Sequence, residues 1–193
     1  MALPTPTDNE LLRLMMAGEE AAFVTLYRRR QGGVYRFAWQ MSGSSAIAEE
    51  VTQEVFLALI GDPRQYDPAR GTLSGYLYGI ARHQVWRCLE RDRRRVSIEE
   101  EEPWQAPAQE DPLSELARRE RIETVRRAVL ALPMRYREVV VLCDLEEMGY
   151  AETAATLGCA VGTIRSRLHR ARALLAGKLA VGLRAGHASR CLV

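Results

Sequence analysis

The stretch that decides the fold runs from Tyr150 to Leu175, YAETAATLGCAVGTIRSRLHRARALL. A first short helix needs a small residue where a second helix crosses it closely, and Ala154 meets that need. Four residues later, Gly158 can adopt the left-handed backbone conformation that ends the helix. A second helix then begins near Val161. Its apolar stripe at helical spacing consists of Ile164, Leu168, Ala171 and Leu175. This pattern predicts a helix-turn-helix.

The remaining faces of that second helix hold polar and basic side chains: Thr163, Arg165, Ser166, His169, Arg170 and Arg172. A helix that buries one stripe and presents such side chains on its outer turns suits the major groove of DNA. Arginine can donate two hydrogen bonds to guanine, while serine and threonine reach phosphates or base edges. The alternative is a surface helix of solvated arginines in a helical bundle. The small residue, the glycine and the periodicity together favour DNA binding.

Helical periodicity extends over nearly the whole chain, and strand signals are nearly absent. Before residue 95 the pattern predicts helices at residues 8–18, 20–41, 44–60 and 73–94. Asp8 is the expected N-cap of the first helix. Gly32 and Gly33 interrupt the second helix, where a kink or a break is expected. The helical pattern resumes at about residue 113 and continues to about residue 183.

The composition changes abruptly between residues 96 and 112. An acidic run, residues 99–102, is followed by several prolines with little apolar periodicity, which is typical of a linker. We therefore predict an all-α protein with two small helical domains, residues 1–95 and 113–183, joined by the acidic linker at 96–112. The helix-turn-helix lies in the C-terminal domain, and residues 184–193 form a tail.

The composition also excludes several classes of protein. The four cysteines are scattered without zinc-ligand spacing or a disulfide framework. No stretch approaches the roughly 18 apolar residues of a membrane span, and the N-terminus lacks the apolar run of a signal peptide. No phosphate-binding loop or catalytic arrangement is evident. We expect a cytoplasmic protein that is not an enzyme and has no metal, no cofactor and no membrane insertion.

The helix at residues 44–60 has an acidic face. Glu50 and Glu54 are four residues apart and share a face, with Gln53 beside them and Glu49 at the edge. A solvated surface is the commoner explanation for such a pair, and a docking surface for a basic partner is the other.

The helix at residues 73–94 has an aromatic–cationic stripe, because Tyr78, Arg82 and Trp86 are spaced four apart. An adjacent face and its continuation consist of Tyr76, His83, Arg87 and Arg91. Aromatic rings stack with unpaired bases and arginine binds the backbone, at about 1–3 kcal/mol per stacked base. The alternative is that Tyr78 and Trp86 belong to the core.

Two segments at the C-terminal end, ALPMRYREVVVL (131–142) and GTIRSRLHRAR (162–172), resemble region four of bacterial sigma factors. The closest group is the extracytoplasmic-function (ECF) sigma factors. In the N-terminal half, IAEEVTQEVFLAL (47–59) resembles region two of the same family. The resemblance covers both predicted domains and is far more specific than a lone helix-turn-helix.

The resemblance implies a protein that binds core RNA polymerase and directs it to promoter DNA, under the control of an anti-sigma factor. The C-terminal domain would bind the −35 element and the polymerase flap. Glu49, Glu50, Gln53 and Glu54 would dock on the clamp helices of the polymerase. The helix at 73–94 and the preceding loop would recognise and melt the −10 element. The loop candidates for holding a flipped base are Arg64, Gln65 and Tyr66.

The chain departs from the family pattern at several positions. The family commonly has Asn at His83 and Asp at Arg87, which puts in doubt which −10 bases are preferred. Tyr76 stands where Trp is common, and Thr153 stands where an aliphatic residue is usual, which would loosen packing.

Two other functions agree less well with the sequence. A stand-alone helix-turn-helix regulator with an N-terminal sensor or dimerisation domain would bind duplex DNA without polymerase. A recombinase would need a catalytic α/β domain, and the helical pattern before Val96 argues against one. The acidic linker would either run through the basic channel of the polymerase or serve only as a tether.

Overall fold

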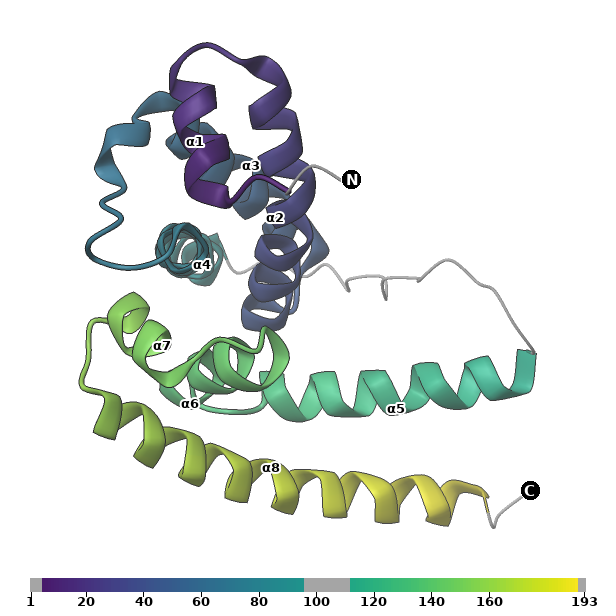
Figure 1. The fold of residues 1–193 in the computed structure, drawn as a ribbon. Coiled ribbons are helices and arrows are strands. Elements are labelled where there is room, and N and C mark those ends of the chain that lie inside the picture. Colours follow the sequence, from purple (N-terminus) through teal and green to yellow (C-terminus); the bar gives the residue numbers. More distant parts are fainter. Residues whose placement is uncertain (1–4, 96–111, 191–193) are drawn as a thin grey trace.

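The computed structural model describes residues 5–95 and 112–190, and every regular element in these ranges is a helix (Figure 1). In chain order they are α1 (Asp8–Met16), α2 (Glu20–Ser42), α3 (Ser45–Gly61), the short η1 (Pro63–Gln65), α4 (Leu73–Arg95), α5 (Pro112–Leu130), α6 (Met134–Val140), the π-helical turn η2 (Val141–Leu145), α7 (Tyr150–Leu157) and α8 (Val161–Arg190). The all-α prediction is confirmed. The acidic run of the predicted linker lies outside the described residues.

The N-cap of the first helix lies one residue earlier than expected. Thr7, not Asp8, is the N-cap: its side chain accepts a hydrogen bond from the backbone of Glu10, whose carboxylate accepts one from the Thr7 N–H at 2.7 Å. This reciprocal pair is a capping box. Asp8 is the first helical residue, and its carboxylate instead binds Arg29 and Arg30 of α2.

The expected break at Gly32 and Gly33 does not occur, because α2 is one continuous helix from Glu20 to Ser42. The glycine at 33 serves close packing. A Cβ atom there would lie 2.7 Å from the hydroxyl of Tyr78 and 3.2 Å from a carboxylate oxygen of Glu146. The backbone of α2 thus makes room for a contact between α4 and the C-terminal half of the chain.

The two halves of the chain, α1–α4 and α5–α8, pack directly against each other (Figure 1). In the N-terminal half, α4 packs on α2 and α3, and in the C-terminal half α7 lies against α4. The largest fully buried side chains belong to one cluster that spans both halves and includes Phe37, Leu26, Met41, Leu59, Leu77, Leu142, Ile164 and Leu168. The predicted domains therefore lie face to face.

The predicted helix-turn-helix is formed by α7 and α8. Ala154 is buried at the crossing, and Gly158 has a φ of 63° in the left-handed turn that ends α7. Ile164, Leu168 and Ala171 are buried as expected. Thr153 is fully buried, so the packing around it is close. Its hydroxyl lies 3.4 Å from the Cys143 sulfur, which gives the buried hydroxyl a hydrogen-bond partner.

Candidate nucleic-acid interface

The outer face of α8 presents the predicted DNA-contacting side chains. Arg165, Ser166, His169 and Arg170 are exposed, and Thr163 is half-buried near the start of the helix. The Ser166 hydroxyl donates to the Thr163 carbonyl at 3.0 Å. The face looks away from the N-terminal half, because α8 lies on the far side of α6 and α7 (Figure 1). It is therefore open to a major groove in this arrangement.

Two arginines of α8 also have partners within the C-terminal half. Arg172 forms a bidentate ion pair with Asp144 of η2, at 3.1 and 2.6 Å, and this contact raises the pKa of Arg172. A hydrogen bond from Arg170 lowers the pKa of Tyr136. Arg165 and His169 are thus the α8 side chains most available for DNA.

The aromatic–cationic stripe of α4 faces the C-terminal half and forms hydrogen bonds with it. Arg82 and Trp86 both donate to the same carboxylate oxygen of Glu138 in α6, at 2.7 and 3.2 Å. The Glu138 side chain is 3% exposed, whereas that of Arg82 is 36% exposed. A carboxylate removed from water in this way needs such donors.

A second carboxylate from the C-terminal half binds next to the first. Glu146, just after η2, accepts a hydrogen bond from the Tyr78 hydroxyl at 2.8 Å and two from Arg36 of α2, at 3.1 and 3.0 Å. Burial, followed by the adjacent carboxylate, raises the pKa of Tyr78 well above its ordinary value. The phenol therefore stays protonated and acts as the donor.

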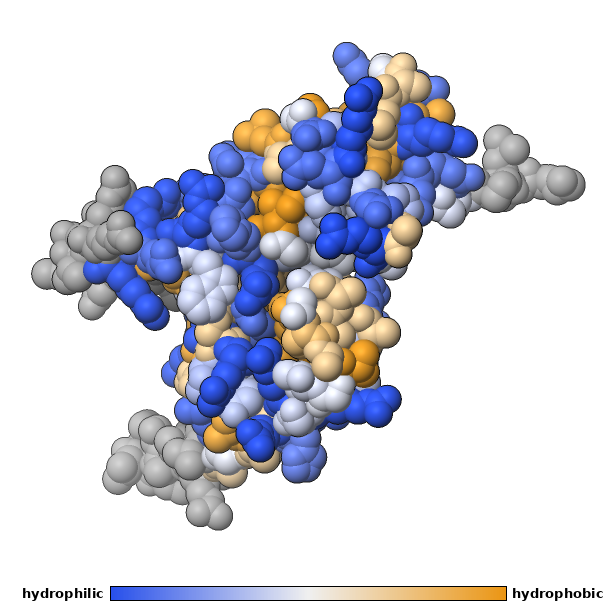
Figure 2. Space-filling model, turned by 90° about the vertical axis from the view of Figure 1, so that its left-hand side faces the viewer, coloured by the Kyte–Doolittle hydropathy of each residue, from blue (hydrophilic) through white to orange (hydrophobic). Residues whose placement is uncertain are grey.

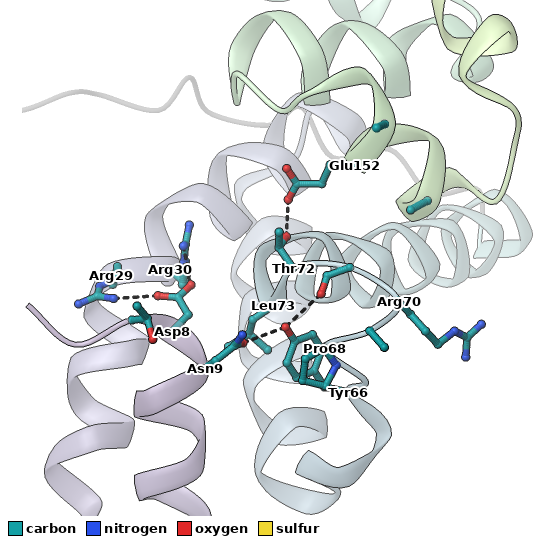
Figure 3. Close-up of a pocket in the computed structure, with 15 residues that line it drawn as sticks. Asp8, Asn9, Arg29, Arg30, Tyr66, Pro68, Arg70, Thr72, Leu73 and Glu152 are labelled. Atoms are coloured by element: carbon teal, nitrogen blue, oxygen red, sulfur yellow. Dashed lines mark hydrogen bonds and ion pairs between the residues drawn. The ribbon is translucent and has the colours of Figure 1, made fainter.

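The loop before α4 is held in place by Tyr66. This side chain is buried, and its hydroxyl lies 2.9 Å from the Asn9 side-chain oxygen and 3.1 Å from the Gly71 carbonyl (Figure 3). Its ring packs on half-buried Tyr76, with centroids 5.6 Å apart. In this structure both tyrosines support the loop, and a role in binding DNA remains a prediction.

The other predicted −10 residues lie on the surface. Arg64, Gln65, His83 and Arg87 are exposed, and Arg91 binds Glu50. A hollow of about 740 Å³ lies between the loop, the start of α1 and α7 (Figure 3). A hydrogen bond between Thr72 and Glu152 of α7 links its walls. The same side of the molecule is mostly hydrophilic, with apolar residues gathered in patches (Figure 2).

The acidic face of α3 is on the surface, as expected both for a solvated face and for a docking site. Glu49, Gln53 and Glu54 are exposed. Glu50 is half-exposed and forms a bidentate pair with Arg91, which lowers the pKa of Glu50. This pair joins a predicted polymerase contact to a predicted DNA contact.

Several residues of these surfaces were not predicted from the sequence. Leu57 is 60% exposed and follows Gln53 and Glu54 at helical spacing, so the acidic face continues into an apolar side chain. Glu138 directly precedes the apolar run VVVL (139–142). A lone carboxylate beside such a run indicates a buried ion pair. No local pattern distinguishes Glu146 or Arg36.

Among the residues that the structure describes, no group of His, Cys, Asp and Glu is arranged to hold a metal ion. Within the same ranges, no helix is both long and apolar enough to cross a membrane.

These features define a class of protein, a two-part helical chain with a C-terminal helix-turn-helix and an aromatic–cationic stripe on α4. Family models match both parts: "Sigma-70 region 2" at residues 26–95 and "Sigma-70, region 4" at residues 122–175. The chain is 37% identical to "ECF RNA polymerase sigma factor SigM" of Mycobacterium tuberculosis, over 88% of this chain and 83% of that protein. The chain belongs to the ECF sigma factors.

Two further comparisons agree. "ECF RNA polymerase sigma factor SigE" of Mycolicibacterium smegmatis is 36% identical over 84% of this chain, and the match spans 65% of that relative's length. The fold is similar to that of the sigma factor RpoE of Bartonella quintana, solved in complex with the anti-sigma factor NepR. That likeness has a TM-score of 0.66 at 24% identity and covers 82% of this chain and 97% of that one.

Proposed function

We propose that this chain is a promoter-specificity subunit, which binds core RNA polymerase and directs initiation to promoters through its two halves. The observation that supports this most is the presence, in one chain, of an outward arginine face on α8 and an aromatic–cationic stripe on α4. The first suits a duplex major groove, and the second suits unpaired bases. A stand-alone regulator has no need of the second surface.

The polymerase would dock on α3, through Glu49, Gln53, Glu54 and the exposed Leu57. Carboxylates at the rim and an apolar side chain at the centre are common at protein interfaces. Glu50 would join them when its pair with Arg91 breaks. The exposed residues on the outer face of α8, above all Arg165 and His169, would bind the −35 element.

The proposal requires no covalent chemistry of the chain. Binding energy to unpaired bases would drive strand separation, and the reaction itself belongs to the polymerase. We also propose control by an anti-sigma factor, because a protein of this fold has been solved in complex with one.

Run-off transcription with purified core polymerase of the source bacterium and a pool of its genomic fragments tests the function. We expect discrete new transcripts that appear only when the chain is present, and fewer of them with the double variant Gln53→Ala, Glu54→Ala. The matched control is Glu19→Ala, which removes an exposed carboxylate before α2. Absence of any new transcript, together with tight duplex binding by the chain alone, would favour the stand-alone regulator.

A further inference from the structure

A second face of α4 lies beside the stripe of Tyr78, Arg82 and Trp86 and differs from it in its contacts. The three side chains of the stripe donate to carboxylates of the C-terminal half. His83 and Arg87 are four residues apart on the neighbouring face, and both are exposed. This face is therefore the part of α4 that a ligand can reach directly.

The Arg87 guanidinium has a neutral hydrogen-bond partner. One of its terminal nitrogens donates to the side-chain oxygen of Gln84, one turn earlier on α4, at 3.3 Å. Arg82, by contrast, binds the carboxylate of Glu138. An amide oxygen orients a guanidinium without cancelling its charge, and this contact uses only one of the five N–H donors of arginine. Arg87 is therefore oriented by Gln84 and still able to form a bidentate contact.

The backbone of α4 is accessible next to these two side chains. A Cβ atom at Gly79, one turn before His83, would meet no other atom within 4 Å. A hollow of about 730 Å³ is lined in part by Tyr76, Ile80 and His83. DNA can therefore approach α4 closely at this point, which contact with base edges requires.

We infer that Arg87 selects a guanine in the −10 element, with His83 contacting a base beside it. The inference rests on the proposed function, because that function places α4 at the −10 element. Guanine presents two acceptors, N7 and O6, on its major-groove edge, and the fork of arginine donors can bind both. No other base presents two acceptors on that edge, so the contact discriminates guanine from all three.

The spacing of the two residues suits neighbouring base pairs. Four residues of an α-helix rise about 6 Å, and base pairs are stacked about 3.4 Å apart. His83 would thus contact a base one or two pairs from the guanine. A neutral imidazole has one donor and one acceptor, so it tolerates more bases than arginine does. Arg87 is therefore the stronger determinant of the two.

The side chain at position 87 sets the direction of the preference. Asp, which is common there in the family, accepts hydrogen bonds and suits the amino group of cytosine. A guanidinium has only donors, so it favours guanine instead. The predicted guanine is therefore a property of Arg87 and not of the fold.

Contact with a phosphate is the other way in which an exposed arginine can bind DNA. Such a contact needs only positive charge, whereas guanine recognition needs the planar fork. The variant Arg87→Lys separates the two, because it keeps the charge and removes the fork.

The test uses holoenzyme reconstituted from the full chain and core polymerase of the source bacterium. The template is a promoter recovered by run-off transcription, with its −10 element randomised. Sequencing of the DNA that the holoenzyme retains gives the base preference at each position. The wild type is compared with Arg87→Lys, with His83→Ala and with the control Arg28→Ala, which removes an exposed arginine of α2.

We expect the wild type to prefer guanine, on one strand and at one position, by about 5- to 150-fold. Arg87→Lys should abolish this preference without abolishing DNA retention. His83→Ala should weaken selection only at a position one or two base pairs away. The control should match the wild type.

A guanine preference that survives Arg87→Lys at the same position would overturn the inference, as would a wild type that retains promoters without preferring guanine at any −10 position. An equal loss from Arg28→Ala would overturn it too, because that result indicates a general charge effect. In these cases the proposed function stands, since the wild type still selects promoters. A wild type that retains no promoter and gives no transcript would refute the proposed function and this inference together, so the two failures are distinguishable.

Discussion

At the scale of single residues, the arginines of α8 differ in their availability although the sequence makes them look equivalent. Arg172 is held by Asp144 and Arg170 contacts Tyr136, whereas Arg165 is exposed on the outer face. An arginine that already has a bidentate partner must give it up before it can bind guanine. Arg165 is therefore the strongest candidate for base recognition at the −35 element.

We predict that Arg165→Ala lowers discrimination between a selected promoter and one with a scrambled −35 element by about 1–3 kcal/mol, which is roughly 5- to 150-fold. The measurement is competition binding of the reconstituted holoenzyme. Arg127→Ala, which removes an exposed arginine from α5, is the control and should leave discrimination intact. Equal losses from both variants would mean that Arg165 supplies only charge.

At the scale of elements, the turn between α7 and α8 depends on Gly158, whose φ of 63° suits a residue without a Cβ. We predict that Gly158→Ala lowers the free energy of unfolding by about 1–2 kcal/mol, the cost of the left-handed conformation. The control is Gly177→Ala within α8, where open space surrounds the site and alanine favours the helix by about 1 kcal/mol. Thermal unfolding followed by circular dichroism should show shifts of opposite sign, and shifts of the same sign would contradict this account of the turn.

The elements themselves could be predicted from the sequence, because caps, glycines and helical periodicity act over a few residues. The Gly158 turn and the burial of Ile164, Leu168 and Ala171 were predicted correctly, whereas Leu175, predicted on the same stripe, is half-buried. The break at Gly32 and Gly33 was predicted wrongly, since the reason for Gly33 is a contact with Tyr78 and Glu146, which come much later in the chain.

The hydrogen bonds between the α4 stripe and the C-terminal half could not be predicted for the same reason. Arg82 and Glu138 are 56 residues apart, and Tyr78 and Glu146 are 68 apart. Tyr78 and Trp86 were proposed either as DNA contacts or as core residues. Tyr78 is buried and its ring packs on Phe37 of α2, whereas Trp86 is 37% exposed, and DNA contact by either stays a prediction. The Tyr78 hydroxyl and the Trp86 indole N–H both donate to carboxylates of the C-terminal half, Glu146 and Glu138.

At the scale of the whole molecule, the two halves pack against each other, and the α4 stripe proposed to bind DNA lies at their interface. The face of α3 proposed to dock on the polymerase is exposed at Glu49, Gln53 and Glu54, so the packing of the two halves leaves these side chains accessible. The Glu50–Arg91 pair is the exception, since it connects that face to α4. Opening is therefore expected when the chain joins the polymerase at a promoter.

The most direct test is the distance between the two halves before and after the chain joins core polymerase on promoter DNA. Fluorescent amino acids at Ala21 of α2 and Ala180 of α8, both exposed, leave the native cysteines in place. Single-molecule energy transfer should show one short-distance population for the free chain and a longer distance in the promoter complex. The same short distance in both states, with transcription intact, would contradict the central claim.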